Sequence, residues 1–133
     1  MNEGPLKLNL GCYDRKLHGF VNVDIRNDVG PDLVDDVFKL MKIKDESADL
    51  IYACHVLEHA GYKESEQALK RWYSVLKKGG TLRLAVPDME AHFAHYYYHR
   101  NLRALHSTFW GSQRHPYDCL LYTSDAADDL LCV

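Results

Sequence analysis

The chain has 133 residues, of which 47% are hydrophobic and 26% are charged, values typical of one soluble globular domain. The formal net charge of −3 is small, so it gives no electrostatic case for a nucleic acid partner. No basic start is followed by a long apolar run and no stretch is long enough to span a bilayer, so we expect a cytoplasmic protein without a membrane partner.

Apolar runs rich in strand formers alternate with helical patterns, which is typical of a parallel α/β sheet. The predicted strands cover Leu6 to Leu10, Val21 to Ile25, Leu33 to Val34, Asp49 to Cys54, and Thr81 to Val86. The first two strands are connected only by Gly11 to Phe20. A helical crossover between parallel strands normally needs a dozen residues or more, so we expect one helical turn here or none.

The first two predicted strands each lead into a residue suited to a nucleoside-bearing cofactor. Gly11 allows the backbone to approach a ligand closely, and the carboxylate of Asp24 can accept hydrogen bonds from a ribose diol. The alternatives are that Gly11 is a turn residue and that Asp24 caps a turn. The short connection and the lack of a G-x-G-x-x-G turn count against a dehydrogenase that binds NAD.

A first helix is expected from Ser65 to Lys78, capped by Ser65 and ended by Gly79 and Gly80. Its apolar face, predicted to pack on the sheet, comprises Ala68, Leu69, Trp72, Val75 and Leu76.

A second helix is expected from Met89 to Leu105. Its His92, His95 and His99 have the spacing of one helical face. We prefer a solvated face or a lid to a metal site, because no acidic or thiolate ligand is fixed nearby.

The end of the chain has an unusual composition. The stretch from Cys119 to Asp128 resembles a sequencing adapter translated in frame, and three aspartates after residue 118 account for the whole net charge. Such segments are excluded from fold reasoning. We therefore expect a truncated domain over residues 1–118 and a non-native tail over 119–133. Of the remaining cysteines, Cys12 and Cys54 could form a disulfide, although two buried thiols are the commoner arrangement.

Six motifs, in this order, resemble those of class I S-adenosylmethionine-dependent methyltransferases. They read LNLGC, GFVNVDIR, DLVDDV, SADLIYACHVLEH, LKRWYSVLKKGGTLRLAVPD and GSQRHPYD. The chain is most similar to a small bacterial branch of methyltransferases, of the type 11 kind, some of which are associated with surface-polysaccharide pathways. The resemblance covers nearly all of residues 6–118. It implies a Rossmann-like, mostly parallel sheet with flanking helices, whose C-terminal strands are missing here.

The resemblance implies S-adenosylmethionine as cofactor and a small molecule or glycan as methyl acceptor, with no metal. It places the backbone from Asn9 through Gly11 to Cys12 at the methionine part and Asp24 at the ribose. Asp36 and Val37 would lie beside the adenine, although Asp36 could equally be a solvated loop acid. Cys54 and His55 would line the floor beneath the sulfonium.

A general base is needed only if the acceptor is a hydroxyl or a protonated amine, and the candidates are His55, Glu58 and His59. The alternative is that Glu58 and His59 only fix their loop. Tyr13 stands where the family usually has glycine, so a positive φ there, or a ring in the cofactor's space, would weaken binding. The alternative function is therefore a catalytically degenerate binding or accessory domain. Because the missing C-terminal strands leave an inner strand as an uncovered edge, we expect the truncated chain to be poorly soluble or only weakly active. The resemblance also implies that the stretches 92–106 and 109–117 form the wall of the acceptor site.

Overall fold

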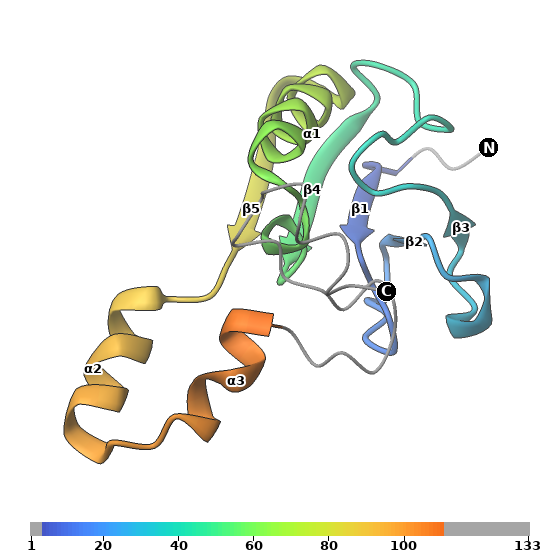
Figure 1. Cartoon of the computed structure of the whole chain (residues 1–133). Helices are drawn as coiled ribbons and strands as arrows, with labels where there is room; N and C mark the ends of the chain where they lie inside the picture. The colour runs from blue at the N-terminus through green and yellow to red at the C-terminus, as the bar shows by residue number, and fades with distance from the viewer. Residues whose placement is uncertain (1–3, 111–133) are drawn as a thin grey trace.

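The computed structural model describes the backbone of residues 4–110 and the side chains of residues 4–106. Its centre is a five-stranded sheet in the order β3-β2-β1-β4-β5 (Figure 1). The strands are β1 (Lys7–Leu10), β2 (Val21–Asp24), β3 (Leu33–Val34), β4 (Ala48–Cys54) and β5 (Leu76–Ala85). Every neighbouring pair is parallel, which confirms the predicted fold class.

The connection from β1 to β2 contains no helix, as its length predicted. Two buried amide side chains hold it instead. Asn22 Oδ1 accepts hydrogen bonds from Asn9 Nδ2 (2.9 Å) and Leu17 N (2.8 Å). Asn9 Nδ2 also donates to the carbonyl oxygen of Arg15 (3.0 Å). The loop is therefore fixed by hydrogen bonds to the strands on which it stands, in place of helical ones.

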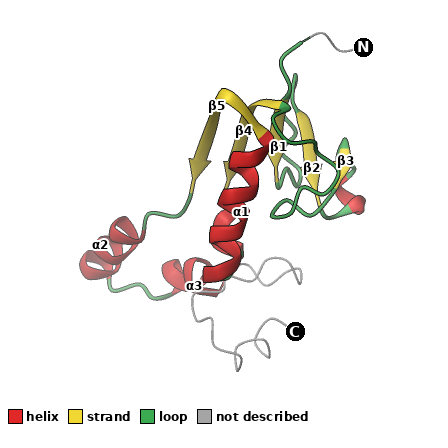
Figure 2. Ribbon diagram, turned by 90° about the horizontal axis from the view of Figure 1, so that it is seen from above, coloured by secondary structure: helices red, strands yellow, loops and turns green. Residues whose placement is uncertain are grey.

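Helix α1 (Tyr62–Val75) packs on one face of the sheet (Figure 2). Ala68, Trp72 and Val75 are fully buried on that helix, as their spacing predicted, whereas Leu69 is 37% exposed. They meet apolar residues from three strands, among them Leu8, Leu10, Val23, Ile51 and Ala53. Burying an apolar side chain as large as valine or leucine stabilises a fold by about 1.5–3 kcal/mol, so this contact contributes substantially to stability.

The predicted bounds of this helix were wrong at both ends. It begins at Tyr62 with Gly61 at the N-cap position, and Ser65 lies inside the first turn, where its Oγ donates to the carbonyl oxygen of Tyr62. The chain turns extended at Leu76, so the glycines at 79 and 80 lie within β5. The final carbonyl groups of α1 accept hydrogen bonds from the backbone of residues 46 and 47, so no glycine is needed to end the helix.

The second predicted helix is in fact two. α2 (Met89–His99) ends at Arg100, which has a left-handed backbone (φ 51°), and α3 (Arg103–Trp110) follows. Asp88 caps α2 by accepting a hydrogen bond from Ala91 N. Both helices lie beyond the carboxyl end of β5, apart from α1 (Figure 1). Among the described residues, no helix has the length and apolar character needed to cross a membrane.

Candidate functional site

The strand order of the sheet reverses between β1 and β4, so the carboxyl ends of these two strands mark its switch point. From β1 the chain moves outward to β2 and β3, and it then returns to add β4 and β5 on the other side of β1. In open parallel sheets, ligands bind in the crevice beyond the carboxyl ends of the strands at such a switch point. Gly11 follows β1 and His55 follows β4, so these two residues lie at the switch point.

Gly11 is required by the fold itself. Its φ is +64°, and a Cβ on it would lie 2.7 Å from Cγ2 of Val56. Its N–H and that of Cys12 both donate to the carbonyl oxygen of Val23, at 2.8 and 3.2 Å. Burial, followed by the nearby Asp24 carboxylate, raises the pKa of the Cys12 thiol. In the segment predicted to face the methionine part, the glycine is thus needed for packing against Val56, and two of the amide donors are already used within the fold.

Asp24 lies at the carboxyl end of β2 and is only 7% exposed. Its Oδ2 accepts a hydrogen bond from Tyr13 N and its Oδ1 accepts one from Arg26 N, both at 2.9 Å. An ionised carboxylate has about four acceptor positions, so each oxygen can accept a further hydrogen bond. Asp24 thus ties together the loops after β1 and β2, as the turn-capping alternative expected, and one acceptor position on each oxygen is not used by these two bonds.

Tyr13 has a positive φ of 44°, the conformation that the sequence analysis expected to weaken cofactor binding. Such a conformation costs about 1–2 kcal/mol in a residue other than glycine. The hydrogen bond from its N–H to Asp24 holds it there, and the guanidinium of Arg26 lies 5.1 Å from its ring centroid. The side chain is 51% exposed. The strain is therefore offset by local contacts.

Asp36 and Val37 begin a loop that α1 holds in place. Asp36 Oδ1 accepts a hydrogen bond from Phe38 N (2.9 Å), and its Oδ2 pairs with Lys39 Nζ at 3.0 Å. The buried indole of Trp72 donates its N–H to the carbonyl oxygen of Val37 at 2.7 Å. Asp36 is thus a turn-forming acid, and the position of Val37 depends directly on the core of the protein.

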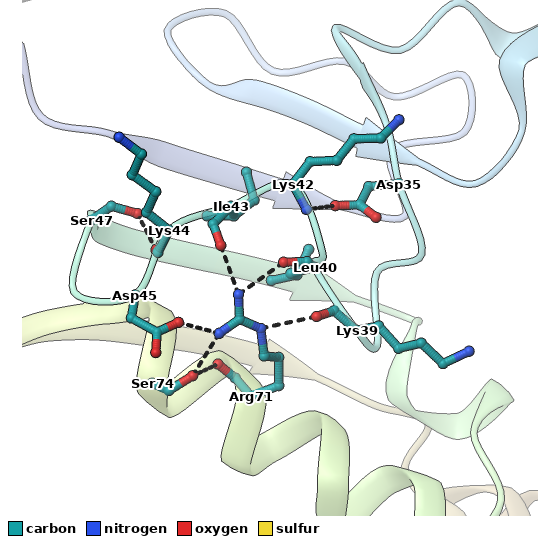
Figure 3. Close-up of polar contacts among 10 residues, drawn as sticks. All are labelled: Asp35, Lys39, Leu40, Lys42, Ile43, Lys44, Asp45, Ser47, Arg71 and Ser74. Atoms are coloured by element: carbon teal, nitrogen blue, oxygen red, sulfur yellow. Dashed lines mark hydrogen bonds and ion pairs between the residues drawn. The ribbon is translucent and has the colours of Figure 1, made fainter.

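Arg71, next to this tryptophan, fixes the rest of the loop (Figure 3). Its guanidinium donates to three backbone carbonyl groups, and it also contacts Asp45 and Ser74. Those carbonyls belong to Lys39 (2.9 Å), Leu40 (2.9 Å) and Ile43 (2.7 Å). Sequence reasoning missed this role, because one arginine on a helix has no distinguishing local pattern.

His55 and Glu58 meet just after β4. His55 has a positive φ of 55°, and its N–H donates to the carbonyl oxygen of Ala85 at 2.9 Å. Its Nδ1 lies 3.1 Å from Oε1 of Glu58, which belongs to the short helix η2 (Leu57–His59). The imidazole is 62% exposed, whereas the carboxylate side chain is 5% exposed. Two of the three candidate bases are therefore in direct contact.

The two cysteines at this edge, Cys12 and the half-buried Cys54, are both free thiols. On α2, the rings of His95 and His99 stack with centroids 4.4 Å apart. Within residues 4–110, no three His, Cys, Asp or Glu side chains form a group that could hold a metal ion. The motif at 111–118 and the expected tail lie outside the described residues.

Half of the chain matches the model of a known protein family. The methyltransferase domain family matches residues 18–84, half of the chain. The chain belongs to this family. The match includes β2 with Asp24, the loop that carries Asp36, and both His55 and Glu58. No curated protein matches this methyltransferase-family chain.

Solved structures with a similar fold are also methyltransferases. A SAM-dependent methyltransferase from Archaeoglobus fulgidus is 17% identical with a TM-score of 0.52, over 71% of this chain and 60% of that one. A protein from Methanococcus maripaludis assigned to the same class is 14% identical with a TM-score of 0.55, over 78% and 60%. A protein from Haloferax volcanii assigned as a methyltransferase, in complex with the Trm112 activator, is 21% identical with a TM-score of 0.53, over 73% and 52%.

These identities are low, so the likeness concerns the fold. The chain spans 60% or less of each of the three solved chains.

Proposed function

We propose that this domain binds S-adenosylmethionine at the carboxyl edge of its sheet and transfers the methyl group to a small-molecule or glycan acceptor. The observation that carries the proposal is the position of Asp24, a nearly buried carboxylate with spare acceptor capacity beside the switch point of a sheet of this family. The acceptor set fits a ribose diol, because each Asp24 oxygen accepts one backbone hydrogen bond and has capacity for another.

The cofactor, when bound, supplies a sulfonium methyl group that is already a good electrophile. The chain then has to hold the acceptor in line with that group and exclude water. In the proposed arrangement Asp24 binds the ribose, and Asp36 and Val37 flank the adenine. Cys54 and His55 lie below the reacting atoms, and His55 accepts a proton from acceptors that carry one. His59 is the second candidate for that role.

Calorimetric titration with S-adenosylhomocysteine tests this proposal. We expect the wild-type chain to bind S-adenosylhomocysteine with micromolar affinity and not to bind NAD. The Asp24→Ala variant should bind at least about fivefold more weakly, since a lost hydrogen bond to a buried charged group costs about 1 kcal/mol or more. Asp14→Ala removes an exposed carboxylate from the same connection and is the matched control.

The folded state of each variant is checked by circular dichroism, because Asp24 also accepts two backbone hydrogen bonds. A folded wild-type chain that binds no S-adenosylhomocysteine would contradict the proposal, and selective binding of NAD would replace it.

A second candidate is a binding or accessory domain that retains the fold without turnover, favoured by the positive φ of Tyr13. If the tyrosine blocks the pocket, Tyr13→Gly should strengthen S-adenosylhomocysteine binding more than about tenfold. The enzyme proposal expects a change below about threefold, because the ring is half-exposed and lies against Arg26.

A further inference from the structure

We infer that Glu58 is a positioning residue that fixes the tautomer and orientation of the His55 imidazole, leaving Nε2 as the nitrogen that accepts the substrate proton. This inference rests on the proposed function for its chemical meaning. Its first observation is the contact between Glu58 Oε1 and His55 Nδ1, at 3.1 Å. A carboxylate accepts but does not donate, so in a neutral imidazole the proton lies on Nδ1 and the free lone pair lies on Nε2.

The burial of Glu58 is the second observation. Its side chain is only 5% exposed, and Oε2 finds no hydrogen-bond partner among the described residues. A buried carboxylate oxygen without a partner costs free energy, and such groups in native proteins call for an explanation. Glu66 on α1 offers a contrast, because it is 63% exposed and paired with Lys70. Stability alone does not account for a carboxylate at position 58.

The backbone of His55 is the third observation. A positive φ in a residue other than glycine is strained, and such strain clusters at functional sites. The hydrogen bond from His55 N to the carbonyl oxygen of Ala85 anchors the strained residue to β5. The side chain is nevertheless 62% exposed, so the ring is held at one edge and accessible elsewhere.

The proton balance follows from this geometry. The O–H or N–H bond of the acceptor breaks and its proton passes to Nε2 of His55. The electron pair left on the acceptor atom forms the new bond to the methyl carbon, whose bond to sulfur breaks with its pair retained by sulfur. The imidazolium that forms carries a positive charge beside Glu58, whose carboxylate stabilises it.

Nitrogen NMR of the histidine rings tests the inference without a known acceptor. A long-range proton–nitrogen spectrum of the ¹⁵N-labelled chain at about pH 8.5, where an ordinary imidazole is neutral, distinguishes protonated from bare ring nitrogens. His55→Gln identifies the His55 signals among those of the eight histidines. We expect the wild-type ring to be protonated on Nδ1. A wild-type ring protonated mainly on Nε2 would overturn the inference, with no variant required.

Glu58→Leu should shift the His55 ring toward the Nε2-protonated form, and Glu66→Leu, the exposed control, should not. The melting temperature of Glu58→Leu should not fall, since an unsatisfied buried carboxylate is removed. An unchanged tautomer in folded Glu58→Leu would overturn the inference. If the wild-type chain fails to bind S-adenosylhomocysteine, the proposed function fails while the tautomer still reports on the contact between His55 and Glu58.

Discussion

Replacing Arg71 should destabilise the loop that carries Asp36 and Val37, the predicted adenine contacts. Its guanidinium donates to three backbone carbonyl groups of the loop and to Ser74, and it pairs with Asp45 (Figure 3). The Asp45 carboxylate is 67% exposed, so that ion pair contributes little. Counting the carbonyl bonds alone, at roughly 1 kcal/mol each, Arg71→Ala should lower the free energy of unfolding by about 3 kcal/mol.

Urea unfolding followed by circular dichroism measures this difference, and the melting temperature should fall by roughly 10–20 °C. Arg71→Lys should recover less than half of the loss, since an ammonium group cannot reproduce the planar fork. The control is Lys70→Ala, whose pair with Glu66 is exposed on both sides and should change stability by less than about 0.5 kcal/mol. If Arg71→Ala lies as close to wild type as this control, the assignment of Arg71 is wrong.

Two further outcomes follow from particular contacts. Gly11→Ala combines positive-φ strain with a 2.7 Å clash and should lower the free energy of unfolding by about 3 kcal/mol. Gly19→Ala, with φ +79° and open space, should lower it by about 1 kcal/mol. Equal losses of stability in urea unfolding would contradict the close contact at Gly11. The ammonium group of Lys77 holds the pKa of Asp49 below its ordinary value, so the carboxylate's contribution is present above about pH 4 and is lost as the pH falls through the lower, folded value. The stability difference between wild type and Asp49→Asn should therefore be constant from about pH 7 to pH 5 and vanish at low pH, and a difference that persists at about pH 2 would contradict it.

Strands β1 to β4 were predictable because each is a short apolar run, whereas β5 was predicted as Thr81 to Val86 and instead begins at Leu76. The connection after β1 was predictable from its length, since ten residues leave no room for a full crossover helix. The helix bounds were not predictable. The end of α1 is set by hydrogen bonds from residues 46 and 47, far away in sequence, and Lys77 pairs with Asp49 on β4. Local capping signals at Gly79 and Gly80 were therefore overridden by tertiary contacts.

The candidate site shows the same division. Gly11, Asp24 and His55 were identified from the sequence because the ends of parallel strands meet at one edge. The roles of Arg71 and Trp72, which hold the loop with Asp36 and Val37, were not identified. Their hydrogen-bond partners include backbone carbonyl groups more than thirty residues away in the sequence. Sequence spacing alone does not predict the contact between His55 and Glu58, because the contact depends on the orientation of the imidazole ring.

Chemical-shift mapping tests the central claim most directly. In a proton–nitrogen titration of the labelled full chain with S-adenosylhomocysteine, the account predicts shifts of the backbone amides that follow β1, β2, β3 and β4, with Tyr13, Arg26, Val37 and His55 among them. The amides of the exposed face of α1 and of α2 should stay in place. A folded chain whose spectrum is unchanged at millimolar ligand, or whose shifts lie away from the carboxyl edge of the sheet, would contradict the account.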